Sequence, residues 1–373
     1  MGGRRSGAVG FGDLRLGRRQ FLAGGALASA GLLLAGCRQE AAQQASQSGS
    51  GGSGGNFPDT PEYNFVFINH VTTNPFFTAT RYGIEDAEAL VGTTSQWTGS
   101  ETSDVQEMVD AMNTAVAGNA DGIAVSIVDP KAFNDPIQQA LDQGIPVIAY
   151  NANGAEGVGG SEEQSNPALA YVGQDLFLSG VEMGKKIVDL VGEGPVALFI
   201  ATPGQLNIQP RIDGAIKAIE DSGANIEYDQ IATGAEVPEE LNRIDAYYQG
   251  HKDVKGMFAV DAGSTQGVAQ VMQKYKLHEQ GVRGGGYDLL PKTLQLLRDG
   301  HIDFTIDQQP YLQGFFPVMQ LYLYKLSGGL TGPAETNTGL IFVTKDEAGK
   351  YLETESRFEG DSEQQKILDS STG

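Results

Sequence analysis

Short apolar runs alternate with amphipathic helical segments along the chain from residue 63 to residue 326. Strands that are apolar on both faces and separated by helices are typical of parallel sheets. About ten such strands exceed the comfortable size of one open sheet, so the pattern predicts an α/β fold class with two doubly wound parallel sheets. The predicted strands are 63–71, 93–97, 121–128, 145–150, 169–173, 196–201, 226–231, 256–260, 284–287 and 302–307. The predicted helices are 75–90 after Asn74, one after Ser103, one after Asp129, 175–191, 211–221, 239–249, 264–275, 291–298 and 311–326.

The residues that follow the predicted strands are the candidate ligand-binding residues, because doubly wound folds bind ligands at the carboxyl ends of their strands. They are neutral amides, carboxylates, one arginine and aromatic side chains. Amides and carboxylates pair well with hydroxyl groups, and aromatic rings pack against the C–H faces of sugars. The set consists of His70, Asn74, Phe76, Phe77, Gln96, Trp97, Asn151, Asn153, Gln205, Asn207, Arg211, Asp261, Asp288, Gln308 and Gln309.

Other kinds of site are disfavoured by what the sequence contains. It has no phosphate loop, no dinucleotide fingerprint and no Gly-x-Ser-x-Gly elbow, so we expect no cofactor. The four histidines stand outside any metal-binding spacing, and Cys37 is the only cysteine, so we expect no metal site. The net charge of −22 argues against a nucleic-acid partner.

The N-terminal segment has the pattern of an export signal. Arg18 and Arg19 precede an apolar run over 21–35 that is too short to span a bilayer comfortably. The arginine pair resembles a twin-arginine signal, and the run 34–37, Leu-Ala-Gly-Cys, resembles a bacterial lipobox whose cysteine is lipidated. We therefore expect a signal at 1–36, lipidation of Cys37 and a flexible tether over 37–61. The alternative is an ordinary signal with a chance cysteine.

Five short motifs stand in an order that resembles the ribose/galactose-type periplasmic binding proteins, the type I solute receptors of ABC importers. They are Asn74-Pro75-Phe76-Phe77, Arg211-x-x-Gly214, the run 258–261 (Phe-Ala-Val-Asp), the run 286–288 (Gly-Tyr-Asp) and the run 305–308 (Thr-Ile-Asp-Gln). The resemblance implies two lobes joined by a three-strand hinge. It would place 62–173 plus 309–338 in the N-terminal lobe and 174–308 plus 339–373 in the C-terminal lobe.

The resemblance also implies roles for individual residues. Phe76 and Phe77 would stack on the sugar, and His70 falls near a polar contact position. The residues implied to contact hydroxyls are Asn74, Asn151, Arg211, Asp261, Asp288 and Gln308. Several of these residues have a plainer interpretation. A phenylalanine could belong to the core, the arginine could lie on the surface of a helix, and an aspartate could only cap a helix.

Three departures from the ribose type count against ribose itself. Asn151-Ala152 stands where the ribose type has Asp-Arg, and Asp261 stands where it has Asn. No aromatic residue occurs near Ala235, where the second lobe would contribute a ring, and Trp97 is a candidate for replacement stacking unless it only packs. Another monosaccharide or a sugar alcohol fits at least as well.

The resemblance implies a binding protein without enzymatic activity. We expect an exported monomer, held by lipid on the outer face of the cytoplasmic membrane, that delivers a small neutral sugar or polyol to an ABC permease and its ATPase. The alternative is a sugar receptor for a sensor kinase or a chemoreceptor. A glycosidase is disfavoured because two moving lobes hold a carboxylate pair poorly. A transcription regulator would need a helix-turn-helix where the lipobox stands.

Overall fold

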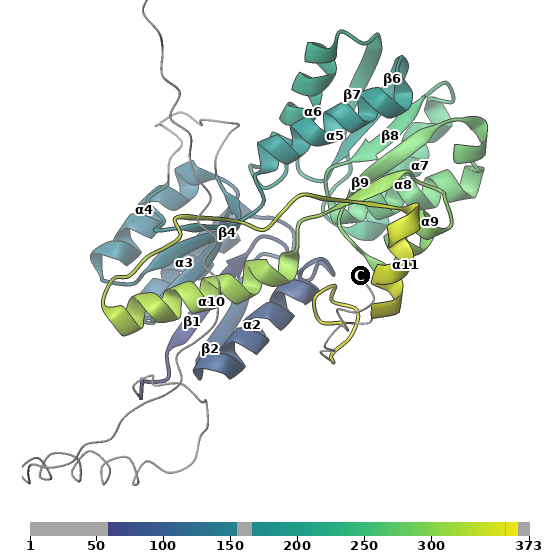
Figure 1. Cartoon of the computed structure of the whole chain (residues 1–373). Helices are drawn as coiled ribbons and strands as arrows, with labels where there is room; N and C mark the ends of the chain where they lie inside the picture. Colours follow the sequence, from purple (N-terminus) through teal and green to yellow (C-terminus); the bar gives the residue numbers. More distant parts are fainter. Residues whose placement is uncertain (1–58, 155–165, 355, 365–373) are drawn as a thin grey trace, which may run out of the picture. The chain divides into compact units, whose positions relative to one another are not determined.

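A computed structural model of the chain describes residues 59–154, 166–354 and 356–364, and it contains two six-stranded sheets (Figure 1). The predicted signal, the lipidation site Cys37 and most of the predicted tether lie outside these residues. The first sheet has the order β11-β5-β4-β3-β1-β2, and all of its strand pairs are parallel. Its strands are β1 (Asn64–Asn69), β2 (Thr94–Gly99), β3 (Gly122–Ile127), β4 (Val147–Asn153), β5 (Tyr171–Gly173) and β11 (Glu335–Asn337).

The second sheet has the order β12-β10-β9-β8-β6-β7. Its strands are β6 (Gly194–Ile200), β7 (Ile226–Ala232), β8 (Gly256–Ala259), β9 (Arg283–Tyr287), β10 (Phe304–Asp307) and β12 (Ile341–Thr344). β12 pairs with β10 in the antiparallel direction, so this sheet is mixed, whereas the sequence pattern predicted only parallel pairs. The α/β class with two doubly wound sheets is confirmed.

Helices cover both sheets and continue the predicted alternation. They are α2 (Phe77–Val91), α3 (Val105–Ala117), α4 (Pro130–Asp142), α5 (Leu176–Val191), α6 (Gln209–Ser222), α7 (Val237–Gly250), α8 (Ala262–Tyr275), α9 (Pro291–Arg298), α10 (Pro310–Ser327) and α11 (Lys345–Thr354), with a 3-10 turn at His278–Gln280. We call the first sheet with α2, α3, α4 and α10 the first lobe, and the second sheet with α5–α9 and α11 the second lobe. The chain passes between the lobes at 174–175, 308–309 and 338–340.

Side chains on the two faces of each strand enter different parts of the core. In the first lobe, Phe67 packs with Leu321 of α10, whereas Ile68 packs with Met112 of α3 and Phe133 of α4. α10 lies alongside α2 although the two are far apart in the sequence (Figure 1). Because each sheet is buried on both faces, only its strand ends are free to form a site.

Two predicted helix starts are wrong. α2 begins at Phe77, because Asn74 instead forms a turn in which its side-chain oxygen accepts from the Phe76 N–H at 3.0 Å. α3 is capped by Asp104, whose side chain accepts from two backbone N–H groups, and not by Ser103. The Asp129 cap is confirmed. β11, β12 and α11 were not predicted, and no described helix is long and apolar enough to cross a membrane.

Candidate functional site

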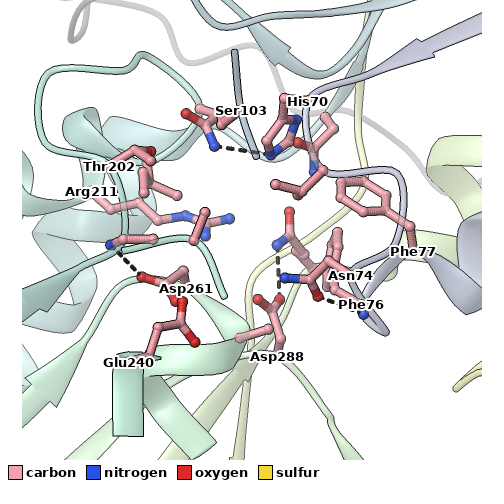
Figure 2. Close-up of a pocket in the computed structure, with 18 residues that line it drawn as sticks. His70, Asn74, Phe76, Phe77, Ser103, Thr202, Arg211, Glu240, Asp261 and Asp288 are labelled. Carbon is pink, nitrogen blue, oxygen red and sulfur yellow. Dashed lines mark hydrogen bonds between the residues drawn. The ribbon is translucent and has the colours of Figure 1, made fainter. Parts of the chain in front are cut away.

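The carboxyl ends of the strands of both lobes meet around a cavity (Figure 2). Of the ten residues expected to contact the ligand, all but Trp97 line this cavity. They are His70, Asn74, Phe76, Phe77, Asn151, Arg211, Asp261, Asp288 and Gln308, and the other lining residues include Ser103, Thr202, Asn207, Ala235 and Glu240.

Trp97 lies behind the aromatic wall of the cavity. Its ring packs against Phe67 and Phe77, with centroids 6.4 and 5.8 Å apart, and its Nε1 donates to the Thr72 carbonyl at 3.1 Å. The indole is therefore used for packing and for holding the loop after β1. The expectation that Trp97 replaces a stacking ring is not supported by this position.

Phe76 and Phe77 have different surroundings although both border the cavity. Phe77 is 2% exposed and belongs to the core, while Phe76 is only partly buried. The two rings meet edge to face, with centroids 4.7 Å apart. Phe76 therefore keeps part of its ring surface accessible, whereas Phe77 is buried in the core and packs against the Phe76 ring.

Arg211 occupies the second lobe's side of the cavity, where the first turn of α6 places it. Its guanidinium donates to the Val260 carbonyl at 2.8 Å and to Gln174 at 3.0 Å, and it lies 4.1 Å from the ring centre of Tyr287. Its Nε is buried without a hydrogen-bond partner in the described part of the chain. A cation this firmly held, with N–H donors left over, is suited to a ligand oxygen.

Gly214 explains why a glycine stands three positions after Arg211 in a motif that brings Arg211 to the cavity. A Cβ at Gly214 would overlap the Phe177 carbonyl oxygen of α5, so only glycine lets α6 approach α5 this closely. The close approach brings the start of α6, and with it Arg211, to the edge of the cavity.

Asp288 is a buried carboxyl that forms no ion pair with any residue the structure describes. It is 5% exposed and has φ of 76°, and Gln308 Nε2 donates to its Oδ1 at 2.8 Å. Burial raises the pKa of Asp288 to about 7, although the positive charge of Arg211 opposes this shift. No ion pair within 4.0 Å joins Arg211 to Asp261 or Asp288 among the residues with described positions.

Side-chain amides connect the ligand candidates to the crossings between the lobes. Asn151 donates to Gln313 at 3.0 Å, and Gln313 donates to Gln308, which holds Asp288. Gln174, at the first crossing, binds Arg211 through Oε1 and donates to the Gly339 carbonyl at the third. These cavity-lining side chains are therefore fixed by amides that lie at or beside the crossings between the lobes.

His70 is buried, and its ring lies between one residue of each lobe. Ser126 Oγ lies 3.0 Å from Nδ1 and Asn207 Nδ2 lies 3.0 Å from Nε2, so both ring nitrogens have partners. Burial lowers the pKa of His70 to about 3. Because Asn207 is in the second lobe, this histidine connects the two lobes beside the cavity.

The loop before α6 adds further hydrogen bonds between the lobes. Ser103 and Gln205 bond to each other twice, with the Ser103 hydroxyl donating at 2.5 Å and the Gln205 amide donating to the Ser103 carbonyl at 2.9 Å. The Leu206 N–H donates to the Val128 carbonyl at 2.9 Å. Because Ser103 lines the cavity, these contacts join the two lobes beside it.

Asp261 and Glu240 form a pair of carboxyls on the second lobe's wall (Figure 2). Glu240 is buried and Asp261 is partly buried, and the two carboxyls lie next to each other. Asp261 was expected from its place after β8. Glu240 was missed because it lies inside a predicted helix, and its one available signal was its closeness to Ala235, where an aromatic ligand contact was sought.

The chain matches the family model described as a periplasmic binding protein domain over residues 65–329. It is 51% identical over 311 residues to the xylose/arabinose-binding protein XylF of Sulfolobus acidocaldarius, a match that covers 82% of this chain and 76% of that protein.

Solved structures with the same fold include two transport-related proteins. A carbohydrate transporter from Acidothermus cellulolyticus 11B in complex with myo-inositol has a TM-score of 0.69 at 25% identity, over 81% of this chain and 100% of that one. An ABC transporter solute-binding protein from Burkholderia graminis C4D1M in complex with D-arabinose has a TM-score of 0.69 at 24% identity, over 78% and 98%.

Proposed function

Because the chain belongs to the periplasmic binding protein family, we propose that it is the sugar-binding component of an ABC importer. The observation that carries this proposal is the cavity that Phe76 shares with Arg211, Asp261 and Asp288. A sugar ring offers an apolar face to the phenylalanine and hydroxyls to the charged groups. The same proposal takes 62–173 plus 309–338 as one lobe of the receptor and 174–308 plus 339–373 as the other.

We propose a neutral aldopentose such as xylose or arabinose as the ligand, since the 51% identical relative is named for these sugars. The carboxyl-rich wall disfavours a sugar phosphate, whose negative charges would face Asp261 and Asp288. The mechanism is binding followed by closure of the lobes, with no covalent chemistry. In this role the protein is a monomer that delivers the sugar to a permease and its ATPase.

Isothermal calorimetry with xylose, arabinose, ribose, galactose, myo-inositol and ribose 5-phosphate tests the proposal. We expect a pentose to bind most tightly and the phosphate to bind weakly or not at all. A bound ligand also raises the melting temperature, because it stabilises only the folded state. Absence of binding and of any thermal shift across the whole panel would refute the function.

We also propose that the protein is exported and anchored through lipid on Cys37. The support is the sequence of residues 1–37 together with the exported location of the family. Cys37→Ser should release the protein from the membrane fraction of an expressing bacterial host. Continued membrane association of that variant would contradict the anchor and leave the sugar-binding proposal untouched.

A further inference from the structure

Glu240 is a buried acid in the wall of the ligand cavity. It is the fourth residue of α7, it is 1% exposed, and it packs against the first turn of α8. At Gly263 of that turn, a Cβ would overlap Glu240 Oε2, so any larger residue would displace the carboxyl. Glu240 therefore fits at this place only because α8 carries no side chain opposite it.

Asp261, which lies beside Glu240, is the member of the pair with hydrogen-bond donors: burial raises its pKa, and the N–H groups of Ser264 and Ala201 oppose that rise. It caps α8, with Oδ1 accepting from the Ser264 N–H at 2.8 Å and Oδ2 accepting from the Ala201 N–H at 3.0 Å. Backbone N–H donors and a helix N-terminus both favour the ionised form of a carboxyl. Two adjacent buried carboxyls do not both ionise without a large cost, so one of them holds a proton, and the donors around Asp261 assign that proton to Glu240.

Glu240 has no comparable support for a negative charge. Its Oε2 is buried and meets no N–H or O–H donor anywhere in the part of the chain that the structure describes. Burial and the negative charge of Asp261 raise the pKa of Glu240, with a further contribution from Glu239. The other charged groups at the cavity are Asp288, at the end of β9, and Arg211, on α6.

We propose that Glu240 is a positioning residue that stays uncharged in the sugar site, donating its proton in a hydrogen bond that fixes the Asp261 carboxylate for the ligand's hydroxyls. This inference rests on the proposed sugar-binding function and describes how the second lobe's wall of the sugar site is built. Asp261 then presents one negative charge to the ligand where two adjacent carboxylates would repel each other. The bond also holds Asp261 in one orientation before the sugar enters, which lowers the entropy lost on binding.

The test compares Glu240→Ala and Glu240→Gln with wild type, using xylose or the tightest ligand of the calorimetric panel. A glutamine side chain donates through its amide as the neutral acid does, so it should rescue most of the affinity that alanine loses. We expect Glu240→Ala to bind at least about tenfold more weakly and Glu240→Gln to stay within about threefold of wild type. Glu239→Gln, a neighbouring exposed glutamate outside the cavity, is the matched control.

The pH profile provides a readout that a purely structural role would not change. Wild-type affinity should fall at alkaline pH, where Glu240 loses its proton and faces Asp261 as a second anion. Glu240→Gln should lack this alkaline loss, whereas Glu239→Gln should keep it. If Glu240→Gln binds the sugar as poorly as Glu240→Ala does, the neutral-acid role is wrong. It is also wrong if the pH profiles of wild type and Glu240→Gln coincide.

A measurement without ligand separates this inference from the proposed function. Thermal unfolding of wild type and Glu240→Gln should diverge as the pH rises, because only wild type releases the buried proton of Glu240 on unfolding and so loses stability. If no sugar binds but the unfolding curves diverge, the proposed function fails and the protonation of Glu240 stands. Parallel curves from about pH 6 to about pH 10 would overturn the inference whatever the ligand.

Discussion

Replacing Asp288 with asparagine should make the ligand-free protein more stable and its sugar binding weaker. Asparagine is the appropriate change because φ at this position is 76°, a conformation that asparagine tolerates and alanine does not. Its side-chain oxygen can still accept the hydrogen bond from Gln308. The substitution therefore removes the buried negative charge and leaves the local structure in place.

The size of the effect follows from the pKa of Asp288. Burial raises this pKa from 3.8 to about 7, so the folded state holds a proton that the unfolded state releases in this range. Wild-type stability then falls as the pH rises from about 4 to about 7, and stays lower above that. A shift of about three pKa units at 1.36 kcal/mol each is worth about 4 kcal/mol, and structural relaxation reduces this to about 2–4 kcal/mol.

Denaturant unfolding of the ligand-free proteins at several pH values measures this difference. Asp288→Asn and wild type should have similar unfolding free energies near pH 4, and the variant should gain about 2–4 kcal/mol by about pH 8. Calorimetry at the same alkaline pH should show about tenfold weaker sugar binding, because a neutral hydrogen bond replaces a charge-assisted one.

Asp307 provides the matched control, because burial raises its pKa to about 6 and it lies outside the ligand cavity. Asp307→Asn should gain about 2–3 kcal/mol over the same pH range without a change in sugar affinity. If the stability of Asp288→Asn tracks that of wild type at every pH, Asp288 does not ionise in a buried site and the reasoning is refuted.

Two further perturbations test the aromatic wall and the C-terminal segment. Phe76→Leu should weaken sugar binding about tenfold with little loss of stability, whereas Phe77→Leu, in the core, should lower the unfolding free energy by about 1–3 kcal/mol; equal effects in calorimetry and unfolding would contradict this division. Arg357 follows α11 in the chain, its side chain is 11% exposed, and it forms ion pairs with Glu85 and Asp86 of the first lobe. α11 itself packs on α9 of the second lobe. Arg357→Met should cost about 1–2 kcal/mol of stability and speed sugar release in stopped-flow measurements, and an unchanged release rate would show that this segment does not restrain opening.

The positions that follow predicted strands could be identified from the sequence because their placement depends on local patterns. An apolar run ends, a polar residue follows, and the parallel arrangement brings such residues to one edge. Asp129 and Asp175 were recognisable as helix starts for the same reason, since capping involves only neighbouring N–H groups. β11 and β12 were not predicted from the sequence, because they are short edge strands with exposed residues. Neither has the buried apolar run by which the other strands were found.

Contacts between distant residues decided the points at which sequence reasoning failed. Ser103 and Asp104 are both good capping residues, and the choice of Asp104 depends on Gln205, 102 positions away, which engages the Ser103 hydroxyl. Gln174 and Gln313 have no local pattern at all, yet Gln174 holds Arg211 and Gln313 holds Gln308 where the chain crosses between the lobes. Since a sugar must contact both lobes to hold them closed, the amides that align those contacts matter as much as the groups that touch it.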